Sequence, residues 1–179
     1  MAIRKLVYVS LFAALTAAAA FLRLPLGMVS VTAQFLITAM AGAVLGAKWG
    51  AISQAVYVAL GLLGLPIFTM GGGFGYVLQP TFGFLLGLIP AAWVIGRVAD
   101  EHTTPHRMAL ACLAGLAVLY VVGLPYMALI LNGYLHSNFS FGKLLMVGCV
   151  PFLPFDAVKV ILAAIVCPAV QRGLRKISY

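Results

Sequence analysis

Two charged side chains near the end of the chain have the types and the spacing to build a binding site. Asp156 and Lys159 lie three residues apart in Pro151-Phe-Leu-Pro-Phe-Asp156-Ala-Val-Lys159, so on a helix both side chains leave the same face. Asp156 is the only one of the three acidic residues that lies within an apolar stretch. A charge at mid-membrane depth costs about 3 kcal/mol on insertion scales. The pair therefore indicates a polar binding site; a structural salt bridge between helices is the alternative.

Two further segments carry polar groups or backbone freedom that a ligand site needs. Thr32 and Gln34 point to the same side if their segment is extended, and diverge if it is helical, where one of them would cap the helix. The glycines of Gly71–Gly75, with Gly73 at their centre, allow the backbone to approach a flat ligand, and Tyr76 follows directly. A plain flexible turn explains the glycines equally well.

The sequence lacks the motifs of the common enzyme classes. Gly71–Gly75 is not followed by Gly-Lys-Ser/Thr, so it is not an ATP-hydrolysing phosphate loop, and there is no GxSxG or HExxH. His102 and His106 have helical spacing, but Pro105 interrupts the turn and no third metal ligand is evident. The three cysteines lie in apolar runs and are interpreted as buried hydrophobes. We expect no catalytic residue, no metal and no cofactor, and therefore a binding or transport protein.

The composition requires the site to be positioned by membrane helices. The 179 residues are 64% hydrophobic and 8% charged, against about 45–50% and about 25% in soluble domains. This predicts an all-α integral membrane protein, with residues 1–179 forming a single transmembrane domain. Six apolar stretches have the length of a membrane span or nearly so. They are Leu6–Leu22, Thr32–Ala47, Trp49–Leu65, Phe82–Val98, Met108–Leu131 and Pro154–Val170. The short connection Gly46–Lys48 predicts a tight helical hairpin.

The net charge of +8 is explained by topology. With six spans both termini share one side, which then carries eight basic residues: Arg4, Lys5, Lys48, Arg97, Arg107, Arg172, Arg175 and Lys176. The opposite loops hold only Arg23 and Lys143. This positive-inside pattern predicts cytoplasmic termini and basic groups that contact lipid, with no nucleic acid as partner. One alternative is that the first stretch is a cleaved secretory signal, because small residues follow Arg4-Lys5 and the apolar run.

The first apolar stretch is rich in alanine. Ala13 and Ala17, or Ala14 and Ala18, form a small-xxx-small face on which another helix can approach closely. Packing within the bundle explains this pattern as well as a partner protein does.

Four segments together resemble one known family. They are Val31-Thr-Ala-Gln34, Gly61-Leu-Leu-Gly-Leu-Pro66-Ile-Phe68, Pro80-Thr-Phe-Gly83-Phe-Leu-Leu-Gly87 and the Pro151–Lys159 segment. Their order and spacing resemble those of the BioY family, the biotin-specific S components of energy-coupling factor (ECF) vitamin transporters. The resemblance covers roughly residues 6–170, and the combination of motifs is specific. One departure is Phe82, which replaces a glycine of the usual Pro-Thr-Gly-Gly and is expected to reshape the pocket wall.

The resemblance implies a six-helix bundle in the cytoplasmic membrane of a prokaryote, with a biotin pocket near the external face. It implies ligand contacts for Asp156 and Lys159, together with Thr32, Gln34, Gly73, Tyr76, Thr81 and Gly83. A transmembrane T subunit and two ATPase subunits would supply energy, so that ATP is used only by partners, although some members of the family function without the full set. Docking to the T subunit is implied for Ala13 and Ala17, and with them Ala14 and Ala18. The alternatives are an S subunit for another vitamin and a solitary proton-coupled carrier that uses Asp156.

Overall fold

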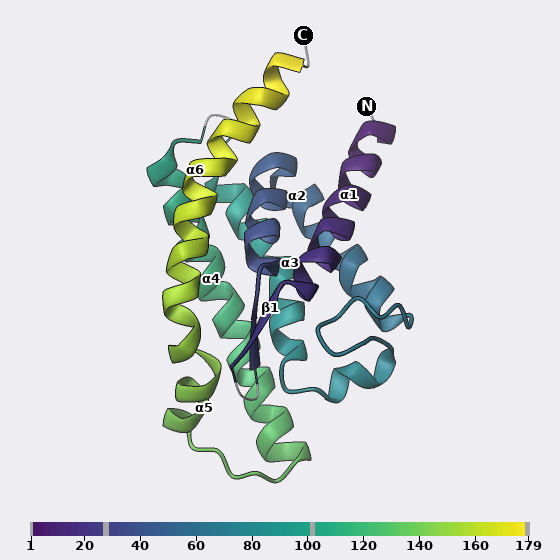
Figure 1. Ribbon diagram of the computed structural model, residues 1–179, viewed down its shortest axis with the longest axis vertical. Helices are drawn as coiled ribbons and strands as arrows, with labels where there is room; N and C mark the ends of the chain where they lie inside the picture. The colour runs from purple at the N-terminus through teal and green to yellow at the C-terminus, as the bar shows by residue number, and fades with distance from the viewer. Residues whose placement is uncertain (1, 27–28, 101–102, 178–179) are drawn as a thin grey trace.

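Helices form nearly all of the regular structure in the computed structural model of the protein, which describes residues 2–26, 29–100 and 103–177 (Figure 1). The long helices are α1 (Ala2–Phe21), α2 (Gln34–Leu62), α3 (Phe82–Val98), α4 (Pro105–Ala128) and α6 (Leu153–Ile177). The shorter elements are the strands β1 (Arg23–Leu26) and β2 (Val29–Thr32), the 3-10 helices η1 (Phe74–Leu78) and η3 (Val150–Phe152), the π-helical η2 (Leu129–Tyr134) and α5 (Phe141–Gly148). Both ends of the chain lie at the same end of the molecule (Figure 1).

Helix α2 folds back on itself at Gly46. This glycine has a φ of 79° and a ψ of 174°, a conformation that favours glycine and breaks the helix. The Thr38 hydroxyl lies 3.0 Å from Gln54 Oε1, whereas sixteen residues of straight helix would separate them by about 24 Å. The predicted tight hairpin is therefore confirmed, and two arms of α2 run side by side.

Glycines allow the helices to pack with their backbones in contact. A Cβ added at Gly42 would lie 2.6 Å from the carbonyl oxygen of Ala92, and one at Gly96 would lie 2.3 Å from the nitrogen of Ala47. These close approaches join α2 to α3, and Gly83 and Gly87 do the same between α3 and α4. Small residues of this kind are typical of helix interfaces in membranes. The result is a buried apolar core contributed by α1, α2, α3, α4 and α6.

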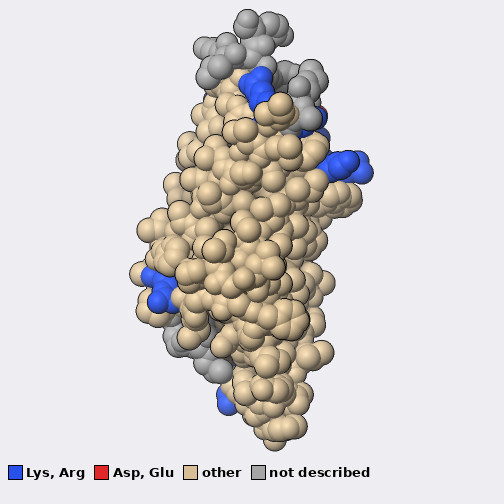
Figure 2. All heavy atoms as spheres, turned by 90° about the vertical axis from the view of Figure 1, so that its right-hand side faces the viewer, with Lys and Arg blue, Asp and Glu red and all other residues tan. Residues whose placement is uncertain are grey.

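Four helical stretches of the described residues are long and apolar enough to cross a membrane. They are Ile3–Phe21, Gln34–Leu62, Pro105–Tyr134 and Phe141–Leu174, and the apolar Phe82–Val98 is somewhat shorter. The second of these is the folded α2. On the face shown in Figure 2, basic side chains lie in two groups separated by a broad region that carries no charged side chain. This arrangement is that of a multi-pass membrane protein.

Two expected loops contain regular structure. The segment Arg23–Val31 is mostly an antiparallel hairpin, in which Arg23 pairs with Thr32. The segment Asn132–Leu145 contains the end of η2 and the start of α5, whose first turn is capped by the Ser140 hydroxyl. The first segment contains Pro25 and Gly27 and the second contains Asn132 and Gly133, residue types that favour turns but do not set a strand register.

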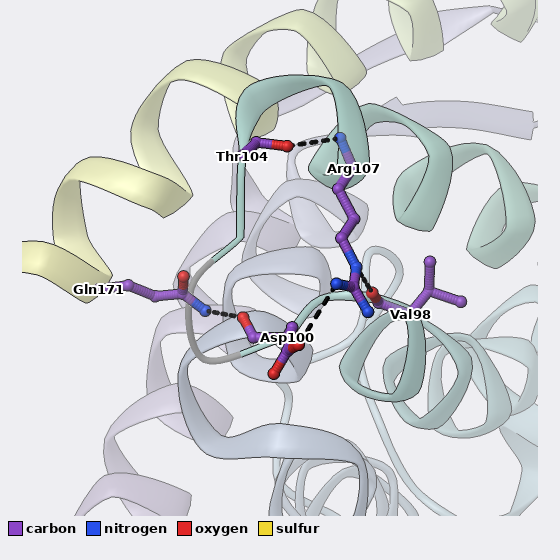
Figure 3. Close-up of polar contacts among 5 residues, drawn as sticks. All are labelled: Val98, Asp100, Thr104, Arg107 and Gln171. Atoms are coloured by element: carbon purple, nitrogen blue, oxygen red, sulfur yellow. Dashed lines mark hydrogen bonds and ion pairs between the residues drawn. The ribbon is translucent and has the colours of Figure 1, made fainter.

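A cluster of polar contacts closes the bundle at the end where the termini lie (Figure 3). The Gln171 amide on α6 donates to the carbonyl oxygens of Ala43 and Asp100 at 2.7 and 3.2 Å. Arg107 on α4 donates to the Val98 carbonyl and forms an ion pair of 3.3 Å with Asp100. The connection between α3 and α4 is therefore held at several points. Of the histidine pair considered as metal ligands, His106 is exposed and His102 lies outside the described residues.

Candidate functional site

A cavity opens in the half of the molecule remote from the termini, where β2, α5 and the start of α6 meet (Figure 1). Its open space is about 690 Å³, with solvent at the mouth included. The lining residues come from elements spread over most of the chain. They are Ser30, Val31, Thr32, Gln34, Phe35, Thr69, Tyr76, Thr81, Phe84, Leu85, Leu88, Leu119, Tyr120, Gly148, Phe152, Asp156 and Lys159.

Most of the residues selected from the sequence meet at this cavity. The structure brings together Thr32, Gln34, Tyr76, Thr81, Asp156 and Lys159. The other two lie elsewhere: Gly83 packs against Tyr126 on α4, and the amide of Gly73 donates to the carbonyl of Gly61 at 2.7 Å. Gly83 therefore allows close helix packing, and Gly73 allows a backbone turn with a φ of 99°.

Asp156 and Lys159 form a buried ion pair in the first turns of α6. The Lys159 ammonium lies 2.8 Å from Asp156 Oδ1, and the two side chains are 13% and 7% exposed, respectively. The other carboxylate oxygen accepts a hydrogen bond of 2.5 Å from the Tyr120 hydroxyl on α4. Each carboxylate oxygen keeps room for a further donor, and the ammonium keeps further protons. The group can thus both accept from and donate to a ligand while remaining neutral overall.

A second polar group faces the cavity from the junction of β2 and α2. Thr32 ends the strand and Gln34 begins the helix, and the Thr32 hydroxyl donates to Gln34 Oε1 at 2.9 Å. The amide nitrogen of Gln34 donates to the Tyr57 hydroxyl at 2.8 Å, and that hydroxyl donates to the Ile67 carbonyl at 3.0 Å. Thr32 and Gln34 therefore act together on one side of the cavity, although Ala33 between them has helical backbone angles and Gln34 begins α2.

The segment 64–81, called the glycine loop below, covers another side of the cavity. Its Thr69 and Tyr76 hydroxyls lie 2.8 Å apart, and both residues line the cavity. Arg23 on β1 donates to the Thr69 carbonyl, which ties the strand hairpin to the loop. Gly71 and Gly73 have positive φ values. A residue with a side chain would be strained in this backbone conformation.

Aromatic side chains form part of the cavity wall, and others lie behind it. Tyr76 lines the cavity, whereas Tyr57, Phe82 and Tyr126 are not among its lining residues. Phe82 is 3% exposed and packs its ring against Phe68, Tyr76 and Tyr126, behind the wall. Phe82, which replaces the usual glycine at this position, therefore supports the glycine loop from the inside. Phe84 and Tyr120, whose rings meet edge to face, supply aromatic surface that the sequence did not indicate.

Several lining residues had no signal in the sequence. Tyr120 lies in the middle of α4, 36 residues before Asp156, and nothing in its neighbourhood distinguishes it from other membrane tyrosines. Phe152 lies within the Pro151–Lys159 segment and Thr69 directly follows the Gly61–Phe68 segment, so their neighbourhood was the available clue. Ser30 immediately precedes the Val31–Gln34 segment.

The alanines of α1 divide between two faces of the helix. Ala13 is 4% exposed and belongs to the core, where the half-buried Ala17 packs against it. Ala14 and Ala18 are exposed, together with Leu11 and Leu15. The pair that is open to a partner in this structure is therefore Ala14 and Ala18, while Ala13 and Ala17 serve packing within the bundle.

Comparison with known proteins gives consistent results. A sequence model described as the BioY family matches residues 1–176. A probable biotin transporter BioY of Lysinibacillus sphaericus is 41% identical over 95% of this chain and 88% of its own length. The biotin transporter BioY of Thermotoga maritima is 36% identical over 91% of this chain and 93% of its own length. The crystal structure of the S-component for biotin from an ECF-type ABC transporter superposes with a TM-score of 0.71 at 27% identity, covering 97% and 92% of the two chains.

Proposed function

This chain belongs to the BioY family, and we propose that its cavity captures biotin for uptake across the membrane, so that the chain is the S component of an ECF-type transporter. The observation that carries this proposal is the neutral Asp156–Lys159–Tyr120 group in a cavity whose remaining wall combines hydroxyl, amide and apolar side chains. Family membership makes the chain part of a transporter rather than an enzyme.

The chemistry of biotin suits the cavity. Its ureido ring has two N–H donors and one carbonyl acceptor, and its sulfur ring and aliphatic chain are apolar. In our proposal Asp156 accepts from a ureido N–H group and Lys159 donates to the ureido carbonyl. Leu85, Leu88 and Leu119 contact the apolar parts of the ligand. A site of paired polar groups discriminates against analogues that leave those groups unsatisfied.

The membrane arrangement in this proposal has six helices crossing the bilayer. The two arms of α2 cross separately, as do α1, α3, α4 and the stretch formed by α5 and α6. The termini and their basic residues lie in the cytoplasm, and the cavity opens to the outside. The positive-inside distribution and the position of the cavity remote from the termini support this orientation. The membrane is the cytoplasmic membrane of a prokaryote.

The partners in this proposal are a transmembrane T subunit and two ATPase subunits, which alone use ATP. The sequence lacks a phosphate loop of its own, so energy has to come from elsewhere. The exposed Ala14 and Ala18 offer a close-packing face for the T subunit. We expect no cofactor in the S component itself.

The test is a titration of radiolabelled biotin into the detergent-purified full chain. Thiamine and riboflavin in excess serve as competitors that should have no effect, and desthiobiotin, which keeps the ureido ring, should compete. Saturable binding with this pattern supports the proposal. A well-folded chain that binds no biotin, or that releases it to thiamine or riboflavin, contradicts it.

A further inference from the structure

The Gln34 side chain can present either of two opposite chemistries to the cavity. One end of an amide accepts hydrogen bonds and the other end donates them. Gln34 is 4% exposed and lines the cavity, so the direction of its amide determines whether the ligand must bring a donor or an acceptor.

The hydrogen bonds behind Gln34 allow its side-chain amide only one orientation. The Ile67 carbonyl can only accept, so the Tyr57 hydroxyl 3.0 Å away uses its single proton there. That hydroxyl then has only lone pairs to offer to Gln34, and it accepts from the amide nitrogen at 2.8 Å. A reversed amide would set Oε1 against an oxygen without a free proton, which is costly because Tyr57 is fully buried.

The same hydrogen bonds hold the oxygen end of the amide on the cavity side. Oε1 accepts from the hydroxyl of Thr32, a residue that itself lines the cavity, and it keeps a second acceptor position. The nitrogen points to Tyr57, which lies behind the wall.

We infer that Tyr57 is a positioning residue for ligand specificity. By fixing the Gln34 amide through the Ile67 carbonyl, it turns one wall of the cavity into a hydrogen-bond acceptor, opposite in character to the Lys159 ammonium. The cavity then has two separate acceptors, Gln34 Oε1 and the Asp156 carboxylate, for the two N–H groups of a ureido ring. This inference rests on the proposed function, in which the ligand is biotin.

The test compares biotin with its two N-methyl derivatives, each of which lacks one ureido N–H. The wild-type chain should prefer biotin to both. Tyr57→Phe keeps the ring that packs edge to face on Phe68 but removes the hydroxyl, so the Gln34 amide is free to turn. The preference for biotin over at least one derivative should then fall about fivefold, the size of one ordinary hydrogen bond. A role in stability alone would lower the affinity for all three ligands alike.

A matched control separates the amide from the glycine loop. The Tyr126 hydroxyl also donates to a carbonyl of this loop, that of Val77 at 2.6 Å, but Tyr126 lies outside the cavity lining. Tyr126→Phe should therefore leave the ratio of affinities unchanged. A second variant, Gln34→Leu, removes the acceptor directly. It should reduce the preference for biotin over the same derivative, whether or not Tyr57→Phe folds well.

The outcomes are distinct. An unchanged ratio in folded Tyr57→Phe or in Gln34→Leu overturns the inference while biotin binding by the wild-type chain sustains the proposed function. An equal change in Tyr126→Phe also overturns it, because loop loosening would then be the cause. A folded wild-type chain that does not bind biotin overturns both.

Discussion

Asp156 holds a hydrogen-bond or ion-pair partner on each of its carboxylate oxygens, and this arrangement determines how the residue can be tested. Lys159 engages one oxygen and Tyr120 the other. A buried charge that loses its partner is strongly unfavourable, whereas an intact pair contributes little net stability. The function of the group is therefore better sought in binding than in stability.

Replacement of Asp156 by asparagine should weaken biotin binding at least about tenfold. The amide keeps the shape of the side chain but leaves the Lys159 charge unpaired and offers one acceptor in place of two. Biotin titration measures the change, and size-exclusion chromatography checks the fold. Asp100→Asn is the matched control, since Asp100 pairs with Arg107 at the other end of the molecule. Unchanged affinity in Asp156→Asn would remove Asp156 from the site.

Tyr120→Phe should have a smaller effect, because it removes one hydrogen bond to a carboxylate that keeps its lysine. We expect a loss of about fivefold in biotin affinity. If Tyr120 acts through Asp156, the same change should have little further effect in the Asp156→Asn background. Additive losses in this double-mutant cycle would instead indicate that the Tyr120 hydroxyl contacts the ligand independently.

At the scale of elements, the packing of α2 against α3 depends on backbone contact rather than on side-chain interdigitation. The region around Gly42 has no space for a side chain, since its nearest neighbour is a carbonyl oxygen of α3. Such contacts fix the distance between helices and therefore the position of Gln34 at the start of the first arm.

Gly42→Ala should destabilise the fold by about 1–3 kcal/mol, the usual cost of overpacking. The added methyl group would lie 2.6 Å from Ala92 O, so the helices have to separate. A thermal unfolding series in detergent measures the shift. Gly173→Ala on α6 is the control, because no atom lies within 4 Å of its added Cβ. Equal midpoints for the two variants would contradict the tight α2–α3 contact.

The two faces of α1 should respond differently to larger side chains. Ala14→Leu with Ala18→Leu enlarges the exposed face, so biotin binding and stability should persist while co-purification with the T subunit falls. Ala13→Leu enlarges the buried face and should lower the unfolding temperature. Retained co-purification of the Ala14/Ala18 variant, with uptake intact, would place the partner on another surface.

At the scale of the whole molecule, charge and cavity are arranged along one axis. The termini lie at one end, and the cavity lies in the other half (Figure 1). This polarity suits the proposed function, in which the ligand is captured on one side of the membrane and the ATPase partners act on the other.

The orientation can be checked with single cysteines in a chain whose three native cysteines are replaced by alanine. His106 and Lys143 are both exposed, and they lie in the first turns of α4 and α5, at opposite ends of the proposed topology. In intact cells a membrane-impermeant maleimide should label Lys143→Cys, whereas His106→Cys should react only after permeabilisation. The reverse pattern would place the cavity on the cytoplasmic side.

The sequence by itself determined the features that depend on composition or on neighbouring residues. The apolar stretches, the reversal at Gly46 and the shared face of Asp156 and Lys159 are of this kind, because helix periodicity and glycine freedom act over a few residues. The junction at Thr32 and Gln34 was left between two alternatives, extended or helical. In the structure Thr32 ends the strand β2 and Gln34 begins the helix α2, so neither alternative describes both residues.

Other features were decided only by the tertiary structure. Tyr120 meets Asp156 across 36 residues, Tyr57 lies behind Gln34, and Phe82 packs inside the wall, although no local pattern distinguishes these aromatic residues from others. The same holds for α1, where two alanine pairs have the same spacing and only contact with α2 shows which of them is covered. Each case depends on which helix faces pack together. That choice is made by the summed contacts of segments far apart in the chain, and in a uniformly apolar sequence hydrophobic periodicity does not encode it.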